Sequence, residues 1–271
     1  MSGQAVEIIG RRVWLLESGS GIPLLYLHGF ADIHSVKPSW LPFHKCLAQR
    51  SRVIAPAHPG CAQSDENDDI DTIDDVVFHY LELLDTLKLD KFDLVGHCVG
   101  GWIAAELAVR HPERIRKLVL IGASGLFVKG ALIGDIFMNA QPEFGFSYAS
   151  LREMLFASAD QAEALDMFPD GKGELEDEVR RYQMLRLSSR IGFRPPYFYN
   201  RALRNRLHRI TSPALVIWGE KDNFVPRSHG ETYAKLIPHS AELKIIQGAG
   251  HSAPVERPLE TAQLLTEFLA N

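Results

Sequence analysis

The stretch FDLVGHCVGGWIAAELA, residues 92–108, constrains the fold of this chain more than any other. A compact apolar run leads into a glycine-rich turn and then into apolar residues at helical spacing, which predicts a strand, a tight turn and a helix. Cys98 stands at the tip of the turn, between Gly96 and the pair Gly100-Gly101. Such a turn needs very small neighbours and lifts its central side chain above the edge of a sheet. This context favours Cys98 as a nucleophile over an inert, small buried residue.

Short apolar runs alternate with helical patterns through the first half of the chain and again near its end. The runs cover residues 23–29, 52–60, 92–98, 117–123, 212–222 and 241–251. Continuous apolar runs are expected in a parallel sheet whose two faces are covered by helices. The alternation therefore predicts an α/β fold. Two further apolar runs flank Gly10-Arg11 and predict an N-terminal hairpin.

Residues 127–207 interrupt the alternation, because they carry helical patterns, many aromatic residues and no convincing strand. We expect one α/β core domain, residues 1–126 and 208–271, with a helical cap inserted as residues 127–207. Aromatic side chains of the insertion are expected to line a largely apolar pocket against the sheet.

Composition and charge narrow the class of protein. The net charge of −5 gives no electrostatic reason to expect nucleic acid binding. No apolar run approaches the roughly 18 residues that span a membrane, and the N-terminus lacks the apolar core of a signal peptide. Three cysteines without a CxxC pair fit a reduced, cytoplasmic protein. The histidines lack zinc-site spacing, so we expect neither a metal nor a cofactor; the oligomeric state is left open.

A nucleophile needs a base, and the base needs an acid that orients it. Asp222 follows the apolar run ALVIWGE, and His251 follows LKIIQGAG. Because the carboxyl ends of parallel strands meet at one edge of a sheet, Cys98, Asp222 and His251 are expected to converge there. Glu220 is the nearby rival of Asp222.

Five motifs in order give the chain its resemblance to the α/β-hydrolase superfamily: LHGF (27–30), APAHPGCAQSD (55–65), GHCVGG (96–101), WGEKDNFVP (218–226) and GAGHSAPVERP (248–258). The resemblance implies a mostly parallel eight-stranded sheet with helices on both faces and a helical cap inserted after the sixth strand. It also implies an oxyanion hole formed by the backbone N–H groups of Phe30 and Val99.

The chain departs from the common pattern at the nucleophile. Most members of the superfamily have serine where this chain has Cys98; dienelactone hydrolases and polyhydroxyalkanoate synthases have cysteine. The aspartate nucleophile of haloalkane dehalogenases and epoxide hydrolases is missing. The cysteine is either natural or a laboratory replacement of serine, and both origins stay open here. Ala57 and Ala62 replace the usual Asp and Gly of the second motif, outside the triad.

Several other residues have a structural and a functional interpretation. We expect His28 and His97 to be structural, and Cys46 and Cys61 to be inert. His34 and His58 are candidates to reach the pocket. The candidate substrate contacts are His34, Trp102, Phe137, Phe144 and Tyr197. The basic run at residues 201–209 is either a solvated helix face or a grip for an anionic substrate such as a coenzyme A thioester.

The resulting prediction is a hydrolase that cleaves an ester, lactone or thioester of a largely apolar small molecule through an acyl-enzyme on Cys98. The alternatives are an acyltransferase, a carbon–carbon bond hydrolase, and a non-catalytic ligand-binding protein on the same fold.

Overall fold

The computed structural model describes residues 2–145, 147–171, 174–193, 197–238 and 241–271. An eight-stranded sheet with the order β1-β2-β4-β3-β5-β6-β7-β8 forms its centre. The strands are β1 (Ser2–Ile8), β2 (Arg11–Ser18), β3 (Pro23–Leu27), β4 (Arg52–Pro56), β5 (Phe92–His97), β6 (Ile115–Ile121), β7 (Ala214–Gly219) and β8 (Ala241–Ile246). The strands from β3 to β8 pair in parallel, whereas β1 pairs with β2, and β2 with β4, in antiparallel fashion.

Each predicted apolar run overlaps a strand, although β6 begins two residues before its run, and the predicted hairpin is the β1–β2 pair. Its turn lies at Ile9 and Gly10, which both have positive φ. Helix α2 begins where Thr72 and Asp75 cap each other: the Thr72 side chain accepts from the Asp75 N–H, and the Asp75 carboxylate accepts from the Thr72 N–H.

Helices cover both faces of the sheet. The helices are α1 (Pro42–Leu47), α2 (Ile73–Thr86), α3 (Val99–Arg110), α4 (Ile136–Asn139), α5 (Ala149–Leu155), α6 (Ala162–Met167), α7 (Leu175–Gly192), α8 (Leu203–Arg206), α9 (Arg227–Leu236), α10 (Ala253–Glu256) and α11 (Pro258–Ala270). Short 3₁₀ turns lie at Pro112–Arg114 and Leu207–Arg209.

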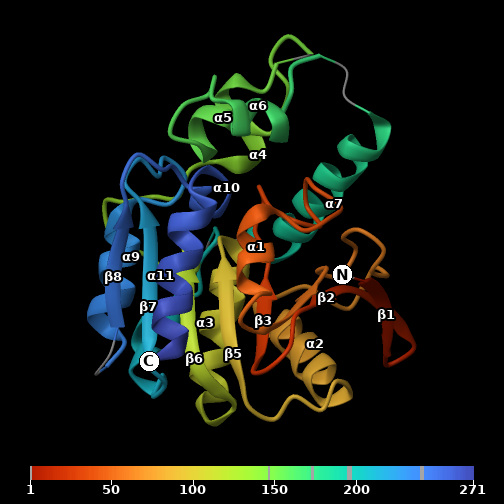
Figure 1. Ribbon diagram of the computed structural model, residues 1–271. Coiled ribbons are helices and arrows are strands. Elements are labelled where there is room, and N and C mark those ends of the chain that lie inside the picture. Colours follow the sequence, from red (N-terminus) through yellow and green to blue (C-terminus); the bar gives the residue numbers. More distant parts are fainter. Residues whose placement is uncertain (1, 146, 172–173, 194–196, 239–240) are drawn as a thin grey trace.

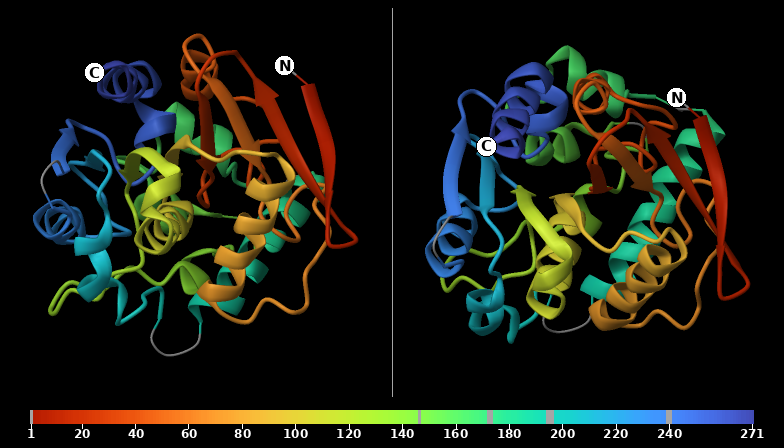
Figure 2. Two further views of the ribbon diagram at one scale, coloured as in Figure 1. Left: turned by 90° about the horizontal axis from the view of Figure 1, so that it is seen from below. Right: turned by 60° about the horizontal axis from the view of Figure 1, so that its bottom comes forward.

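Alternate residues of the strands face two separate cores. On β6, Leu118 and Leu120 belong to the core under α2, α3 and α9, whereas Val119 and Ile121 belong to the core under α1 and α11. Figure 2 shows these two helical layers on opposite sides of the strands. The mostly parallel, doubly covered sheet confirms the predicted fold class.

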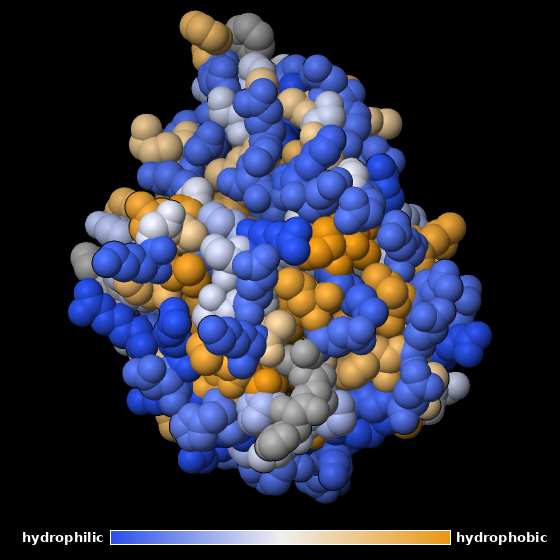
Figure 3. Space-filling view, turned by 90° about the vertical axis from the view of Figure 1, so that its left-hand side faces the viewer, coloured by the Kyte–Doolittle hydropathy of each residue, from blue (hydrophilic) through white to orange (hydrophobic). Residues whose placement is uncertain are grey.

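The chain between β6 and β7 carries α4 to α8, and its described residues form no strand. Figure 1 shows α4, α5 and α6 beyond the carboxyl ends of the strands, and α7 beside them. On the side that carries β8 and α9, hydrophilic residues predominate over the upper part, and hydrophobic residues gather at mid-height (Figure 3). The division into a core domain and a cap at residues 126/127 and 207/208 stays a prediction.

Candidate active site

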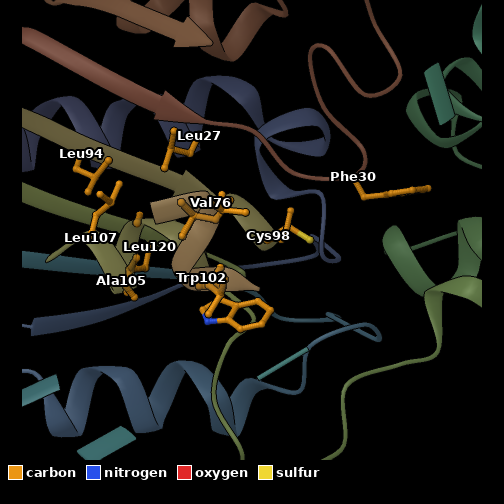
Figure 4. Close-up of a cluster of buried hydrophobic side chains, with 14 of the residues drawn as sticks. Leu27, Phe30, Val76, Leu94, Cys98, Trp102, Ala105, Leu107 and Leu120 are labelled. Carbon is orange, nitrogen blue, oxygen red and sulfur yellow. The ribbon is translucent and has the colours of Figure 1, made fainter. Parts of the chain in front are cut away.

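Cys98 occupies a strained turn between β5 and α3. Its backbone has a φ of 57° and a ψ of −120°, and it is the N-cap residue of α3. A Cβ atom at Gly100 would collide with the backbone carbonyl of Leu27, so only glycine lets the helix approach β3 this closely. Figure 4 shows the Cys98 sulfur directed away from the strands, on the side where Phe30 lies. The turn therefore holds a thiol at the start of a helix, where the helix dipole favours negative charge.

Asp222 and His251 lie just after β7 and β8, on the same edge of the sheet. His251 Nδ1 donates a hydrogen bond of 2.8 Å to Asp222 Oδ2. The other carboxylate oxygen of Asp222 accepts from the N–H groups of Phe224 at 3.0 Å and Val225 at 2.8 Å. Both side chains of the His251–Asp222 pair are buried. Asp222 is thus fixed in place, and it fixes the orientation of the imidazole.

The opposite nitrogen of His251, Nε2, is buried and forms no hydrogen bond of ordinary geometry with the described residues. Burial by itself lowers the pKa of His251, but the charge of the Asp222 carboxylate, with a smaller effect from Cys98, outweighs it and raises this pKa to about 10. The Asp222 carboxylate on Nδ1 therefore favours the protonated form of His251.

The segment that contains Phe30 lies against Cys98. A Cβ atom at Gly29 would come within 2.7 Å of Cys98 Cβ. Among the described residues, neither the Phe30 nor the Val99 N–H donates to a protein acceptor. Two backbone N–H groups next to the Cys98 turn are therefore without a protein acceptor.

The rival for the acid, Glu220, is engaged elsewhere. Glu220 accepts a hydrogen bond of 2.9 Å from the Gly248 N–H, whereas His251 Nδ1 bonds Asp222. Ser124 carries no carboxylate, and its hydroxyl lies 3.5 Å from the Cys98 carbonyl oxygen. The choice of Asp222 over Glu220 is consistent with this geometry.

Four of the predicted histidines lie behind the site. His58 Nε2 bonds the His28 carbonyl oxygen at 2.9 Å, and the His58 N–H donates to His28 Nε2 at 3.0 Å. His34 Nε2 bonds the Ala55 carbonyl oxygen at 2.9 Å. All three rings are buried, which lowers the pKa of His34 and of His58 to about 4 and that of His28 well below its ordinary value. They are neutral at pH 7 and hold loops together.

The fourth, His97, connects to a residue that the sequence analysis missed. His97 Nδ1 bonds Asp32 Oδ2 at 3.0 Å, and His97 Nε2 lies 3.3 Å from the His251 carbonyl oxygen. Asp32 also accepts from the Gly29 N–H at 3.1 Å and the Tyr26 hydroxyl at 2.6 Å. Burial opposes ionisation of Asp32, yet hydrogen bonds and the charges of His97 and His44 lower its pKa to about 2. Asp32 thus links the Gly29–Phe30 segment to the His251 loop.

A cavity of about 520 Å³ lies between the start of the insertion, the segment after α7, and α9. We call it the apolar cavity; its lining residues are Leu126, Phe127, Val128, Ala131, Leu132, Ile133, Gly134, Asp135, Phe137, Phe193, Tyr197, Phe198, Tyr199 and His229. Two aromatic rings lie between this cavity and His251. Phe198 packs on Phe224 at 6.3 Å between ring centroids, and Phe224 packs edge-on against His251 at 4.8 Å.

The predicted substrate contacts divide into two groups. Phe137 and Tyr197 line the apolar cavity. Trp102 and His34 do not: the Trp102 indole is buried and donates to Glu106 at 3.1 Å, and His34 is bonded behind the site. Phe144 also lies outside the cavity and is 91% exposed.

Within the described residues, no group of three or more His, Cys, Asp or Glu side chains is arranged to hold a metal ion. In the same part of the chain, none of the helices combines the length and the apolar character needed to cross a membrane.

Comparison with known proteins agrees with this architecture. Residues 22–258 match the family model described as alpha/beta hydrolase fold. The 2-hydroxymuconate semialdehyde hydrolase of Pseudomonas sp. (strain CF600) is 31% identical, over 99% of this chain and 94% of its own length. The monoacylglycerol lipase ABHD6 of Homo sapiens is 26% identical, over 92% of this chain and 75% of its own length. The crystal structure of a serine hydrolase, CCSP0084, from Cycloclasticus zankles superposes with a TM-score of 0.81 at 21% identity, over 99% of this chain and 98% of that one. The chain belongs to the α/β-hydrolase family and is a hydrolase of that fold.

Proposed function

We propose that this hydrolase cleaves an ester, lactone or thioester of a largely apolar small molecule through an acyl-enzyme on Cys98. The observation that carries the proposal is the geometry around one thiol. Cys98 lies at a helix N-terminus beside His251, and Asp222 holds the far nitrogen of His251 at 2.8 Å. Nucleophile, base and orienting acid are the elements that covalent acyl transfer requires.

In the first half of the reaction, the proton of Cys98 resides on His251 Nε2 and the thiolate attacks the substrate carbonyl carbon. The C–S bond forms as the carbonyl π electrons move onto oxygen. When the tetrahedral intermediate collapses, the bond to the leaving group breaks and His251 gives its proton to that group. The product of this half is a thioester on Cys98.

In the second half, water loses a proton to His251 and attacks the thioester carbonyl. The C–S bond breaks, the acid is released, and the Cys98 thiolate beside the His251 imidazolium is restored. The N–H groups of Phe30 and Val99 stabilise the oxyanion in both halves, since they flank the thiol and have no protein acceptor. Each such donor typically contributes about 3 kcal/mol to transition-state stabilisation.

Carbon–carbon bond hydrolysis is a second candidate, because the relative at 31% identity is named as a 2-hydroxymuconate semialdehyde hydrolase. In that reaction the leaving group is a carbanion, which must be protonated as the bond breaks. Acyl transfer to an alcohol or thiol, and ligand binding without turnover, are the remaining alternatives. We also propose a cytoplasmic location, which the free state of Cys46, Cys61 and Cys98 supports.

The decisive experiment measures turnover of p-nitrophenyl esters of graded chain length and of 2-hydroxymuconate semialdehyde. We expect ester turnover, an acyl adduct on Cys98 by intact-protein mass spectrometry, and at least about a hundredfold loss in His251→Ala. Added alcohols or thiols that divert the product would indicate an acyltransferase. Cleavage of the semialdehyde alone would favour the second candidate.

The variant Cys98→Ser tests whether the site is built for sulfur. A serine hydroxyl has a much higher pKa and shorter bonds than a thiol, so His251 must generate the nucleophile unaided. In a natural cysteine enzyme we expect Cys98→Ser to lose ester turnover. A strong gain, with a burst and slow deacylation in the parent, would identify a serine enzyme in which the nucleophile was replaced.

A further inference from the structure

Two chain segments that are distant in sequence run side by side along one wall of the apolar cavity. Gly125 and Tyr199 form a parallel bridge, in which the Gly125 N–H donates to the Phe198 carbonyl at 2.9 Å and the Asn200 N–H to the Gly125 carbonyl at 3.0 Å. The register brings Phe127 and Tyr199 together, with ring centroids 5.1 Å apart. The wall of the cavity is therefore fixed by backbone hydrogen bonds.

Beyond this wall the same two segments carry positive charge. A second cleft, which we call the basic cleft, is lined by Phe127, Lys129, Arg201, Arg204 and Asn205. Phe127 lines both the apolar cavity and the basic cleft. The two hollows thus adjoin at one aromatic side chain.

The three cations of the basic cleft lack partners. Lys129, Arg201 and Arg204 are exposed, and none forms an ion pair or side-chain hydrogen bond within the described ranges, although most other arginines do. The chain as a whole is acidic, with a net charge of −5, so a local group of uncompensated cations marks a place suited to an anion.

Asp135 and His229, which line the apolar cavity, both form hydrogen bonds to the backbone, whereas the buried Nδ1 of His229 has no partner among the described residues. Asp135 Oδ1 accepts from the N–H groups of Phe137 at 3.1 Å and Met138 at 3.0 Å, and His229 Nε2 bonds the Ala131 carbonyl oxygen at 2.8 Å. The remaining lining is predominantly aliphatic and aromatic. The apolar cavity therefore offers a ligand a mainly apolar surface. Unpaired positive charge lies only at the outer edge of this cavity, in the basic cleft.

We propose that the apolar cavity and the basic cleft form one binding site for an amphipathic anion, with an apolar body and a carboxylate or phosphate at one end. This inference rests on the proposed function, because it assigns the bound anion as the substrate. The body fills the cavity, and the anionic end contacts Lys129, Arg201 and Arg204. The reacting carbonyl is at the opposite, inner end, beside Phe198 and Phe224. Phe198 and Phe224 must turn aside for that carbonyl to reach Cys98.

Matched substrates test the assignment. The p-nitrophenyl half-ester of a dicarboxylic acid carries a terminal carboxylate, and the p-nitrophenyl ester of the monocarboxylic acid of equal length does not. We expect the ratio of their kcat/KM values to favour the anion at low ionic strength, and to fall about threefold in Arg204→Gln and further in Arg201→Gln/Arg204→Gln. Added salt at about 0.5 M should have the same effect on the parent, because the contacts are exposed.

The matched control is Arg206→Gln. Arg206 is on the same short helix, is also exposed and unpaired within the described residues, but lines a different cleft with Val109, Arg110 and Arg209. We expect the kcat/KM ratio of this variant to equal that of the parent. An equal fall in Arg204→Gln and Arg206→Gln would mean a general field effect and would overturn the site.

Calorimetric titration with octanoate, octyl phosphate and 1-octanol separates this inference from the proposed function. Both anions should bind more tightly than the alcohol, and Arg204→Gln should reduce that difference. Anion-selective binding without turnover of any ester would support the site and reject the hydrolysis. Equal binding of all three ligands would overturn the site. Sedimentation with anionic phospholipid vesicles that depends equally on Arg204 and Arg206 would overturn it in favour of membrane attachment.

Discussion

Hydrogen bonds from the surrounding backbone hold Cys98 in its strained conformation. A non-glycine residue with a φ of 57° and a ψ of −120° stores roughly 1–3 kcal/mol of strain. Cys98 N donates to the Ile121 carbonyl oxygen at 2.9 Å, and its own carbonyl oxygen accepts from the Trp102 and Ser124 N–H groups, each at 3.2 Å. The neighbouring strand β6 and helix α3 therefore hold the turn from both sides.

The three thiols are predicted to differ sharply in reactivity. Near neutral pH we expect iodoacetamide to alkylate Cys98 fastest, because a cysteine at a helix N-terminus beside a histidine occupies the kind of environment in which reactive thiols are found. Burial raises the pKa of Cys61 to about 12, so Cys61 should stay unmodified in the native protein. Peptide mass spectrometry over a time course measures the three rates.

The comparison with Cys46 makes this test stringent, since Cys46 is partly exposed and Cys98 is buried. Accessibility alone would therefore put Cys46 first. The variant Cys46→Ser should leave the labelling rate of Cys98 unchanged. Faster labelling of Cys46 or Cys61 than of Cys98 in the native protein would contradict an activated Cys98.

At the scale of the elements, the insertion is fastened to the loop that carries His251. The Glu256 carboxylate, on α10, accepts from the Ala157 N–H at 2.7 Å, the Gln161 side chain at 2.8 Å and the Gly250 N–H at 2.7 Å. The Ser252 N–H also donates to the Leu155 carbonyl oxygen at 2.9 Å. The chain on both sides of His251 is thereby tied to the end of α5 and the turn that follows it.

We predict that Glu256→Ala lowers kcat for ester hydrolysis about tenfold with a smaller change in KM, because the loop of His251 loses its support while the apolar cavity is untouched. Three donors lose their acceptor, so the free energy of unfolding should also fall by about 1–3 kcal/mol. Steady-state kinetics and urea unfolding measure both effects. Glu260→Gln, an exposed change on the neighbouring α11, is the control.

If Glu256 only stabilised the fold, the Glu256→Ala variant would behave differently. The substitution would reduce the amount of folded enzyme and leave kcat per folded molecule unchanged. Full specific activity of the folded Glu256→Ala protein would therefore reject Glu256 as a positioning residue for His251.

The sequence predicted elements well where a local pattern dictates them. The run at residues 92–98 became β5, which ends one position earlier, at His97, because Cys98 leaves the strand for the turn. The helices of the insertion could be expected only as a group. Their ends depend on contacts such as the stacking of Phe30 on Phe168, 6.1 Å apart, which join the insertion to a loop far away in the chain.

In the candidate site, too, some residues could be predicted from local sequence motifs and others could not. Cys98, Asp222 and His251 each follow a strand in a recognisable motif, so their convergence could be predicted. Asp32 lies in the loop ADIHS, which carries no sequence signal of its own. Its importance arises from contacts with Tyr26, Gly29 and His97, which only the folded chain brings together. Glu256 was part of a motif, but its link to the insertion was not readable from the sequence.

At the scale of the whole molecule, buried neutral histidines couple folding to pH. Burial lowers the pKa of His44 to about 4 and that of His79 to about 3, in addition to the effects on His28, His34 and His58. Below an unfolded value of about 6.5, the unfolded chain binds protons that the folded chain does not, so stability falls as pH falls. His251 does not offset this loss: its folded pKa is raised, so its stabilisation is complete below pH 6.5. The pKa of Asp32 is lowered to about 2, so the stabilisation of the fold by its ionised carboxylate is lost only as the pH falls towards 2.

We therefore predict that the free energy of unfolding falls by several kcal/mol between pH 7 and pH 4.5, and that the urea midpoint falls with it. Each unit of pKa difference between the folded and unfolded states corresponds to about 1.4 kcal/mol per group.

His79 supplies a direct test because it lies on α2, away from the candidate site, and its Nε2 has no partner within the described residues. His79→Gln removes one titrating group, so its unfolding free energy should depend less steeply on pH than that of the parent. His208→Gln, at an exposed position, is the control and should keep the slope of the parent. Urea unfolding followed by circular dichroism at four pH values gives the slopes. A flat profile in the parent, or equal slopes for the two variants, would show that these histidines do not control acid stability.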